Sequence, residues 1–417
     1  MSVDSVIQLK CSCNQYPWGK KGAESLSAQI CSKTPGWDED DKGNKVDFKI
    51  RDDTYYSEMW MGTYPVLPTY DVKSGKDLQE IIDAHPNELI GTVVPKKFGH
   101  TNLPFLPKVL SIRKALPLQL HPNKDLAAEL HQKDPQNFTD PNHKPEIALA
   151  LGKFEAFCGF KELEVIKPLL ELEPLQKFLP TIKKPDFDDQ SLKHVVKSML
   201  EADEDTVEKT VKELEKLDDS AFGKETHIKP LIPRLADQYG KTDNGLLVAL
   251  ITMNFLTLKA GEGIYIPADG IHAYLSGDII ECMARSNNVL NTGFCPQAER
   301  NSVELFCSCL TFSPHSPEEC MLRAQKYSGS KNGQSQVYKP PMSEFNMIVT
   351  ELAKGETEVL AAVQGPSIAL ATKGNATLKA KGKSYDVKEG NVFFIGAGTE
   401  VELTSDDGLQ MHTAYVE

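Results

Sequence analysis

The chain has 417 residues, of which 40% are hydrophobic and 25% are charged, and its formal net charge at pH 7 is −13. This length allows two or three domains, and the composition is that of a globular protein. The acidic balance argues against nucleic acid or an anionic membrane as a partner, but it is compatible with a local cationic pocket for a small anion.

The N-terminal sequence lacks the basic start and apolar run of a secretion signal, and no stretch approaches the length of a membrane span. Nine cysteines are scattered through the chain. Cys11 with Cys13 and Cys307 with Cys309 form Cys-x-Cys pairs that could bind metal, but neither has a second closely spaced pair nearby, which favours packing. We therefore expect reduced, buried cysteines and a cytoplasmic protein.

The N-terminal part of the chain predicts strands separated by polar segments. Residues 7–20 alternate like a first strand, whereas residues 34–55 are polar and carry the acidic run 38–41, which predicts a solvated loop. A short helix is expected near residues 78–84, and residues 105–112 read as a strand.

Two clusters of possible metal ligands follow. Gln119 and His121 alternate with leucines, so in a strand both polar side chains leave the same face. The sequence NHKPE then places His143 and Glu146 directly before an apolar strand at 147–151. Histidine and glutamate together suit Zn²⁺, with positions left for a further histidine and for water or substrate.

From residue 161 to about residue 241, apolar residues recur at helical spacing among many glutamates and lysines, which predicts a helical insertion. β-Structure is predicted to resume over 247–258. The sequence GEGIYIPADGIH, ending at His272, then aligns without a gap with GNVFFIGAGTEV, ending at Val401. Two copies of one hairpin predict two similar β-barrels, of which only the first offers a ligand at this position.

Taken singly, the candidate ligands are weak, because a lone histidine in a strand is more often a hydrogen-bonded core residue and glutamine is a rare ligand. Together Gln119, His121, Glu146 and His272 form a four-ligand set on a barrel wall, which favours a zinc site. An iron oxygenase is disfavoured because Gln119 fills a coordination position and the usual two-His-one-carboxylate spacing is not evident.

Five blocks, QYPWGK, SEMWMGTYP, QLHPNK, NHKPE and GIHAYLSGDIIECMA, resemble in order the signature blocks of the type I phosphomannose isomerases. The resemblance spans nearly the whole chain and implies one Zn²⁺ per chain, held by Gln119, His121, Glu146 and His272. It also implies interconversion of mannose 6-phosphate and fructose 6-phosphate by proton transfer between C1 and C2 through an enediol, which feeds GDP-mannose and glycosylation.

The fold implied by the resemblance is mainly β with a helical insertion: two cupin-like (jelly-roll) β-barrels plus an α-helical domain. We expect residues 1–160 and 246–315 to form a metal-binding cupin domain, 161–245 the helical insertion, and 316–417 a C-terminal cupin-like domain without metal. The C-terminal domain is expected to pack, dimerise or cover. The expected partner is a sugar phosphate, with no nucleic acid and no membrane, and the chain is expected to be a monomer or homodimer.

Glu281 is a plausible base, because a carboxylate among apolar neighbours has its pKa raised toward neutral pH. An equally open alternative is that it only orients a metal ligand. Lys108 either lies at a strand edge with its ammonium in solvent or points into a pocket. Lys144 and Lys108 match family lysines near the sugar phosphate, and we expect Lys144 to take part in catalysis as well.

The chain departs from the family after the ECMA block. Asn287 stands for a family Asp, Asn291 for a family Arg and Gln297 for a family Lys, while Pro117 replaces a Ser. We expect Asn287 and Asn291 to line the substrate site. Loss of a cation that steadies enediolate or phosphate charge could cost several kcal/mol of transition-state stabilisation.

Two explanations remain. The protein is an isomerase in which Arg285, which shares strand parity with Glu281, replaces the lost cation, with Arg300 and Arg113 as further candidates. Alternatively, it is a catalytically weakened zinc-cupin paralogue that binds a sugar phosphate in a regulatory or structural role.

Overall fold

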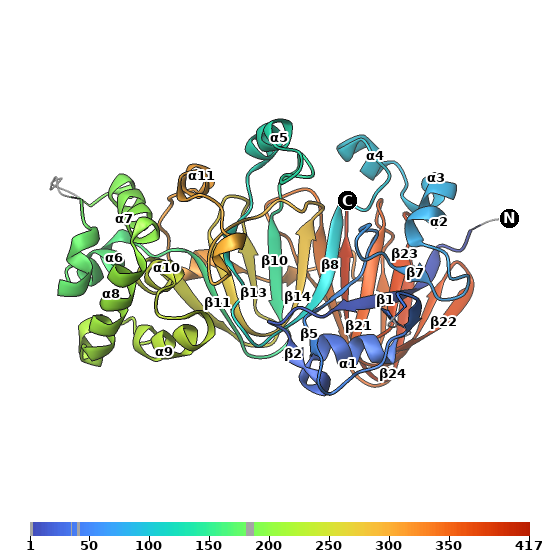
Figure 1. Cartoon of the computed structure of the whole chain (residues 1–417). Helices are drawn as coiled ribbons and strands as arrows, with labels where there is room; N and C mark the ends of the chain where they lie inside the picture. The colour runs from blue at the N-terminus through green and yellow to red at the C-terminus, as the bar shows by residue number, and fades with distance from the viewer. Residues whose placement is uncertain (1–2, 35, 40–41, 181–186) are drawn as a thin grey trace.

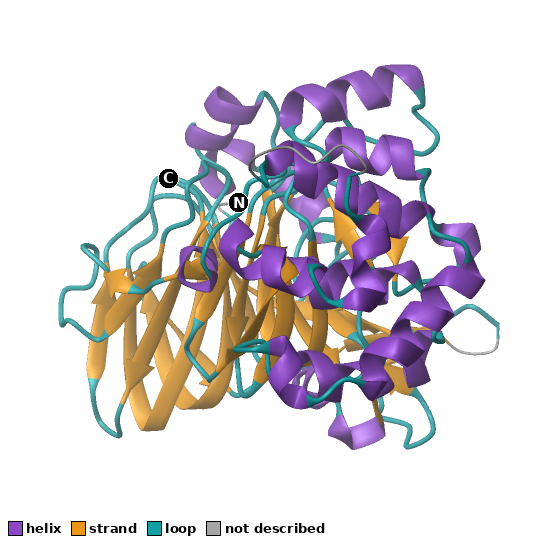
Figure 2. Cartoon of the chain, turned by 90° about the vertical axis from the view of Figure 1, so that its left-hand side faces the viewer, coloured by secondary structure: helices purple, strands orange, loops and turns teal. Residues whose placement is uncertain are grey.

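The structure is a computed structural model that describes residues 3–34, 36–39, 42–180 and 187–417. It is built mostly from antiparallel sheet with a group of helices at one end (Figure 1; Figure 2). Within the described residues, β1 and β3 pair in parallel and the other named strand pairs are antiparallel. No described helix has the length and apolar character needed to cross a membrane.

The elements divide by position along the chain. Up to residue 160 the strands are β1 (Val6–Asn14), β2 (Lys20–Lys21), β3 (Gly36–Glu39), β4 (Lys45–Asp47), β5 (Tyr55–Tyr56), β6 (Glu58–Trp60), β7 (Tyr70–Asp71), β8 (Phe105–Ile112), β9 (Leu118–Leu120), β10 (Glu146–Ala150) and β11 (Phe154–Phe160), and the helices are α1 (Leu26–Lys33), α2 (Leu78–Ala84), α3 (Pro86–Leu89), α4 (Val93–Phe98) and α5 (Lys124–Lys133). The helices that follow are α6 (Leu163–Leu170), α7 (Asp189–Glu201), α8 (Glu204–Lys216), α9 (Ile228–Tyr239) and α10 (Asn244–Leu247). The remaining elements are β12 (Met253–Leu258), β13 (Gly263–Ile266), β14 (His272–Ala284), β15 (Leu290–Gly293), α11 (Val303–Cys309), β16 (Met321–Leu322), β17 (Gln325–Lys326), β18 (Ser335–Tyr338), β19 (Asn346–Leu352), β20 (Thr357–Leu360), β21 (Ser367–Ala380), β22 (Lys383–Lys388), β23 (Val392–Ile395) and β24 (Val401–Tyr415).

Strand β14 joins two sheets. Its first residues pair with β11 and β9, and its later residues pair with β8 and β10. The change of partner occurs at Gly277, whose φ is 123° and where a Cβ would lie 2.5 Å from the carbonyl oxygen of Lys153. Only glycine tolerates this close approach and this backbone angle. One strand can therefore carry side chains to both sheets.

Helices α6 to α10 cover the sheet formed by β12, β11, the first part of β14, β9 and β15, and share one hydrophobic core with it. In Figure 1 they lie at the left end, with β8, β10 and β14 in the middle and the C-terminal strands at the right. The helices predicted from residue 161 onward are confirmed as α6 to α10. Residues 181–186 of the segment lie outside the described residues.

The strand predicted over 247–258 is wrong in its first half. The helix α10 continues into a π-helical turn, η4 (Val248–Thr252), and β12 begins only at Met253. Val248 to Thr252 are buried on every side, and a short apolar run does not distinguish a buried helix from a buried strand. The helix-start signal was Asp243, whose side chain accepts a hydrogen bond from the Gly245 amide at 2.7 Å.

The polar segment 34–55, predicted as a loop, contains the hairpin β3–β4. Strand β3 pairs with β1, so backbone hydrogen bonds form the strand although its sequence lacks apolar alternation. Part of the acidic run, Asp40 and Asp41, lies outside the described residues.

The internal repeat is confirmed at the level of secondary structure. Strands β13 and β23 occupy the same aligned positions, and the following strands β14 and β24 begin at His272 and Val401, the last aligned residues. Among the described residues, however, the sheets do not close into barrels. All nine cysteines lie among the described residues, are buried as expected, and form no disulfide.

Candidate metal centre

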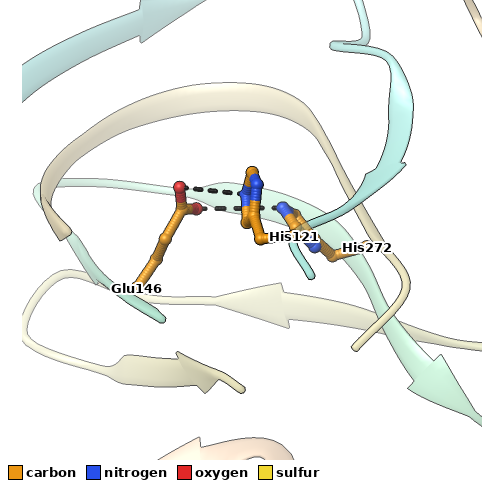
Figure 3. A group of neighbouring side chains, drawn as sticks. All are labelled: His121, Glu146 and His272. Carbon is orange, nitrogen blue, oxygen red and sulfur yellow. Dashed lines mark ion pairs between the residues drawn. The ribbon is translucent and has the colours of Figure 1, made fainter. Parts of the chain in front are cut away.

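Three buried side chains converge where β9, β10 and β14 meet. The Nε2 atom of His121 lies 3.2 Å from Oε1 of Glu146, and the Nε2 atom of His272 lies 3.8 Å from its Oε2. These ligand atoms all fall within 4.8 Å of one another. Figure 3 shows both imidazole rings turned toward the carboxylate. Two histidines and a carboxylate at such spacing can hold a metal ion.

The hydrogen bonds at the far side of each ring leave Nε2 free for a metal. Nδ1 of His121 lies 2.8 Å from the carbonyl oxygen of Asn288, and Nδ1 of His272 lies 3.0 Å from that of Gly270. A carbonyl only accepts, so each Nδ1 carries the proton and each Nε2 presents its lone pair. Both Nε2 atoms are buried without a hydrogen-bond partner in the described structure, which fits a bound cation.

The protonation states also suit a divalent cation. Burial and, secondarily, the Lys144 ammonium lower the pKa of His121 to about 4, and burial lowers the pKa of His272. Burial alone would raise the pKa of Glu146, but the Lys144 ammonium holds it well below its ordinary value. At neutral pH the cluster therefore offers two neutral imidazoles and one carboxylate.

Gln119 lies beside the cluster. It is directly opposite His272 in the pairing of β9 with β14 and opposite Asn291 in the pairing with β15. Directly opposed residues of neighbouring antiparallel strands project from the same face, so the Gln119 side chain lies on the face of His272. The position is suitable for a fourth ligand, as the sequence predicts.

A second charged group lies on the adjoining sheet. Lys108 and Glu281 are paired across β8 and β14, and the ammonium of Lys108 is 2.9 Å from Oε1 of Glu281 and 3.6 Å from Oε2 of Glu58. Lys108 is only 6% exposed and lies 5.0 Å from the Trp60 ring centroid. The lysine is therefore an interior residue, which excludes the strand-edge alternative.

Glu281 shares a face with Glu146 because Ala148, two residues after Glu146, is paired with Glu281 across β10 and β14. Such diagonal neighbours lie roughly 7–8 Å apart. Burial raises the pKa of Glu281 to about 7; the ammonium of Lys108 opposes this shift and the carboxylate of Glu146 adds to it. A carboxyl with this pKa can exchange a proton near neutral pH.

The segment before β10 contributes one lysine to the cluster. The ammonium of Lys144 lies 3.3 Å from Oε1 of Glu146, as expected for a residue of the site. His143, which the sequence offered as a possible ligand, instead places its Nε2 atom 2.5 Å from Oε1 of Glu344 in the C-terminal part of the chain. His143 is therefore directed away from the metal cluster.

Arg285 lies next to the site without touching the cluster. Its guanidinium donates to the carbonyl oxygen of Thr63 at 3.3 Å and lies 4.8 Å from the Tyr64 ring centroid. Tyr64 in turn contacts Trp60, whose ring lies beneath Lys108. No carboxylate of the described residues forms an ion pair with Arg285.

The other two candidate arginines are directed elsewhere. Arg300 forms an ion pair of 2.7 Å with the buried Asp243, and Arg113 packs over the ring of Tyr55. These contacts hold both side chains elsewhere in the structure, and their reach to the pocket stays a prediction.

The two asparagines predicted to bind substrate differ in their environment. Asn291 lies on β15 opposite Gln119, and its Oδ1 atom is buried without a partner in the described structure. Asn287 is exposed in the loop after β14, and its backbone amide donates to Asp140 at 2.8 Å. Only Asn291 is next to a proposed ligand.

Sequence reasoning missed three residues of the site. The Tyr274 hydroxyl donates to Oε2 of Glu146 at 3.3 Å, and Glu58 is the second carboxylate beside Lys108. Tyr274 could have been found from its parity with His272 on the same strand. Asn288, which accepts from His121, left no signal because it acts through its backbone carbonyl.

Comparison with known proteins identifies relatives over the whole chain. Residues 6–163 match the model for the phosphomannose isomerase type I catalytic domain, and residues 335–383 match the model for its C-terminal region. Mannose-6-phosphate isomerase of Candida albicans is 35% identical over 100% of both chains. The protein of that name from Saccharomyces cerevisiae is 35% identical over 99% of each chain.

Solved structures show the same fold. A crystal structure of zinc-bound mannose 6-phosphate isomerase superposes with a TM-score of 0.80 over 99% of this chain and 100% of the other, at 24% identity. A variant of phosphomannose isomerase from Salmonella typhimurium gives a TM-score of 0.80 over 99% of each chain, also at 24% identity.

We predict that the purified chain binds one Zn²⁺. His272→Ala should weaken zinc binding by more than about 100-fold, because loss of a hydrogen-bond partner of a ligand alone typically costs about 10- to 100-fold. Gln119→Ala should weaken it less, because three ligands remain. Metal analysis and competition with a chromogenic chelator measure both effects. His194→Ala, which removes an exposed histidine, is the control. Equal zinc affinity in His272→Ala and His194→Ala would contradict the assignment.

Proposed function

The chain belongs to the type I phosphomannose isomerase family, and on this premise we propose that it is a zinc-dependent aldose–ketose isomerase that interconverts mannose 6-phosphate and fructose 6-phosphate. The observation that carries the proposal is the His121–Glu146–His272 cluster, whose tautomers and charge suit a divalent cation. The curated relatives that match the full chain are named for this activity.

The proposed zinc ligands are His121, Glu146, His272 and Gln119. Bound zinc would polarise the sugar carbonyl and its neighbouring hydroxyl and stabilise negative charge in the enediolate. The protein's own contribution is to hold the two rings by carbonyl hydrogen bonds and the carboxylate by Tyr274 and Lys144. These contacts orient the ligands before a metal or a sugar arrives.

Glu281 is the proposed base that moves the proton between C1 and C2. Its raised pKa allows it both to take and to return a proton at neutral pH. Its hydrogen bond runs to Lys108, not to a histidine of the cluster, which supports the role of base over that of orienting a ligand. The Lys108 ammonium favours the ionised form of Glu281 that acts as the base, and Lys144 supplies a further cation 3.3 Å from Glu146.

Arg285 is the proposed cation for the phosphate end of the sugar. It forms no ion pair among the described residues, although the Asp140 carboxylate is near enough to stabilise its charge, and it lies on the side of Lys108 occupied by Trp60 and Tyr64. An arginine without an ion-pair partner suits a phosphate, which it can bind through two parallel hydrogen bonds. Asn291 and, more peripherally, Asn287 would contact sugar hydroxyls.

A zinc-binding paralogue that holds a sugar phosphate with little turnover is the less favoured alternative. Its motivation is the loss of family charges at Asn287, Asn291 and Gln297. The relatives at 35% identity are named as isomerases, and the buried pair of Lys108 and Glu281 has no evident use in simple binding.

We further propose that residues 1–160 and 246–315 form the metal-binding cupin domain, with 161–245 as a helical insertion and 316–417 as a second cupin-like domain. The matching starts of β14 and β24 support two related units. A monomer or homodimer working in the cytoplasm remains part of the proposal.

We predict turnover of mannose 6-phosphate in a coupled assay, with kcat/KM falling as pH drops through an apparent pKa at or below about 7. The sign follows from Glu281, which burial makes harder to ionise and which is active as the carboxylate. Glu281→Gln should abolish turnover. Lys108→Met removes the charge that favours ionisation, so its acid limb should move to higher pH.

The exposed Lys379 provides a control, because Lys379→Met removes a charge far along the C-terminal sheet. Its pH profile should match that of the unsubstituted protein. An acid limb that stays in place in Lys108→Met, or full activity in Glu281→Gln, would refute the assignment of Glu281.

Substitution of Arg285 tests separately whether it replaces the family arginine that is Asn291 in this chain. Arg285→Ala should lower kcat/KM by about 10- to 100-fold, mainly through KM, the equivalent of about 1.5–3 kcal/mol for a hydrogen bond to a charged group. Arg113→Ala, which removes an arginine committed to Tyr55, should leave kcat/KM unchanged. Unaltered kinetics in Arg285→Ala would show that another group binds the phosphate.

A further inference from the structure

Resting on the proposed function, we propose that Glu344, in the C-terminal part of the chain, is a positioning residue that fixes the segment carrying Lys144 and Glu146. The link is direct: Oε1 of Glu344 lies 2.5 Å from Nε2 of His143, one residue before Lys144 and three before Glu146. The C-terminal part would then shape the metal centre as well as pack against it.

The contact between Glu344 and His143 lies mostly in the interior of the protein. Glu344 is only 3% exposed, and its other oxygen accepts a hydrogen bond of 3.1 Å from the Ser343 amide. A carboxylate taken out of water is costly unless it is paired. Such a buried pair often adds little net stability compared with apolar packing, so its value is better sought in the geometry it enforces.

The segment between the pair and the metal ligand is stiff. Pro145 has a fixed φ, and the residue before a proline, Lys144, is restricted to extended backbone. A displacement of His143 is therefore transmitted to Glu146 with little loss. The carbonyl oxygen of Pro145 accepts from the Ala284 amide at 3.0 Å, which fastens one side of the segment to β14. Glu344 holds the other side.

Glu344 is anchored through the next residue to β8, the strand that carries Lys108. The next residue, Phe345, is 1% exposed and its ring lies 6.4 Å from that of Phe105 on β8. Both rings belong to the hydrophobic core shared by β8, β10 and the C-terminal strands. Packing of Phe345 holds the backbone next to Glu344, and the Ser343 amide holds its carboxylate.

A contact that only joins the C-terminal part of the chain to the sheets of the metal centre should leave zinc affinity unchanged. The chain offers such a contact as a matched control. The Tyr338 hydroxyl, at the end of β18, donates to the carbonyl oxygen of Gly261 and so connects the C-terminal part of the chain to the loop before β13. This contact does not involve residues 143–146. Tyr338→Phe removes it while keeping the ring.

The test compares Glu344→Gln, His143→Gln, the double variant and Tyr338→Phe. Glu344→Gln and His143→Gln should each lower zinc affinity about 10-fold, as measured by chelator competition, and should lower kcat more than they raise KM. The double variant should resemble either single variant, because all three lose the same interaction. Tyr338→Phe should retain zinc affinity and kcat at comparable thermal stability.

Zinc affinity in both single variants within twofold of that of Tyr338→Phe would overturn the inference, as would effects that add fully in the double variant. His143→Gln changes the more exposed partner and keeps the test decisive if Glu344→Gln folds poorly. Chelator competition needs no turnover. A wild-type chain that binds zinc but does not isomerise mannose 6-phosphate would therefore refute the proposed function and leave the role of Glu344 open to the zinc measurement.

Discussion

The burial of the Glu146 carboxylate is the constraint on which the rest of the structure depends. Glu146 is 2% exposed, and a charge in that position must be compensated. Lys144, Tyr274 and the two histidines surround it, yet both histidines present unprotonated Nε2 atoms and so add no positive charge. Lys144 balances the charge of the carboxylate, but the two Nε2 lone pairs beside it have no hydrogen-bond partner among the described residues. Two such nitrogens next to a carboxylate oxygen are the donor set of a divalent cation such as zinc.

Strand β14 converts this local requirement into an active-site layout. It begins with the ligand His272, changes sheets at Gly277, and continues to Glu281 beside Lys108. A single strand thereby sets the spacing between the metal cluster and the proposed base. Arg285 follows directly after its end, so the same strand also determines where the phosphate cation can lie.

Much of this layout follows from local sequence signals. The alternation at Gln119 and His121 follows from the two-residue period of a strand. The position of His272 follows from the gapless alignment of two similar stretches of the sequence. What could not be predicted depends on tertiary contacts: the partners of Lys108 come from β6 and β14. Chain regions far apart in sequence likewise decide the positions of His143 and Arg285.

The most direct test of the central claim follows the C2 proton itself. In D₂O, NMR of mannose 6-phosphate with zinc-loaded protein should show deuterium appearing at C2 of the recovered substrate, together with fructose 6-phosphate. Chelated protein should show neither. Tight binding of the sugar phosphate to the zinc-loaded protein, with no product and no exchange at C2, would contradict the account and identify a binding protein in place of an isomerase.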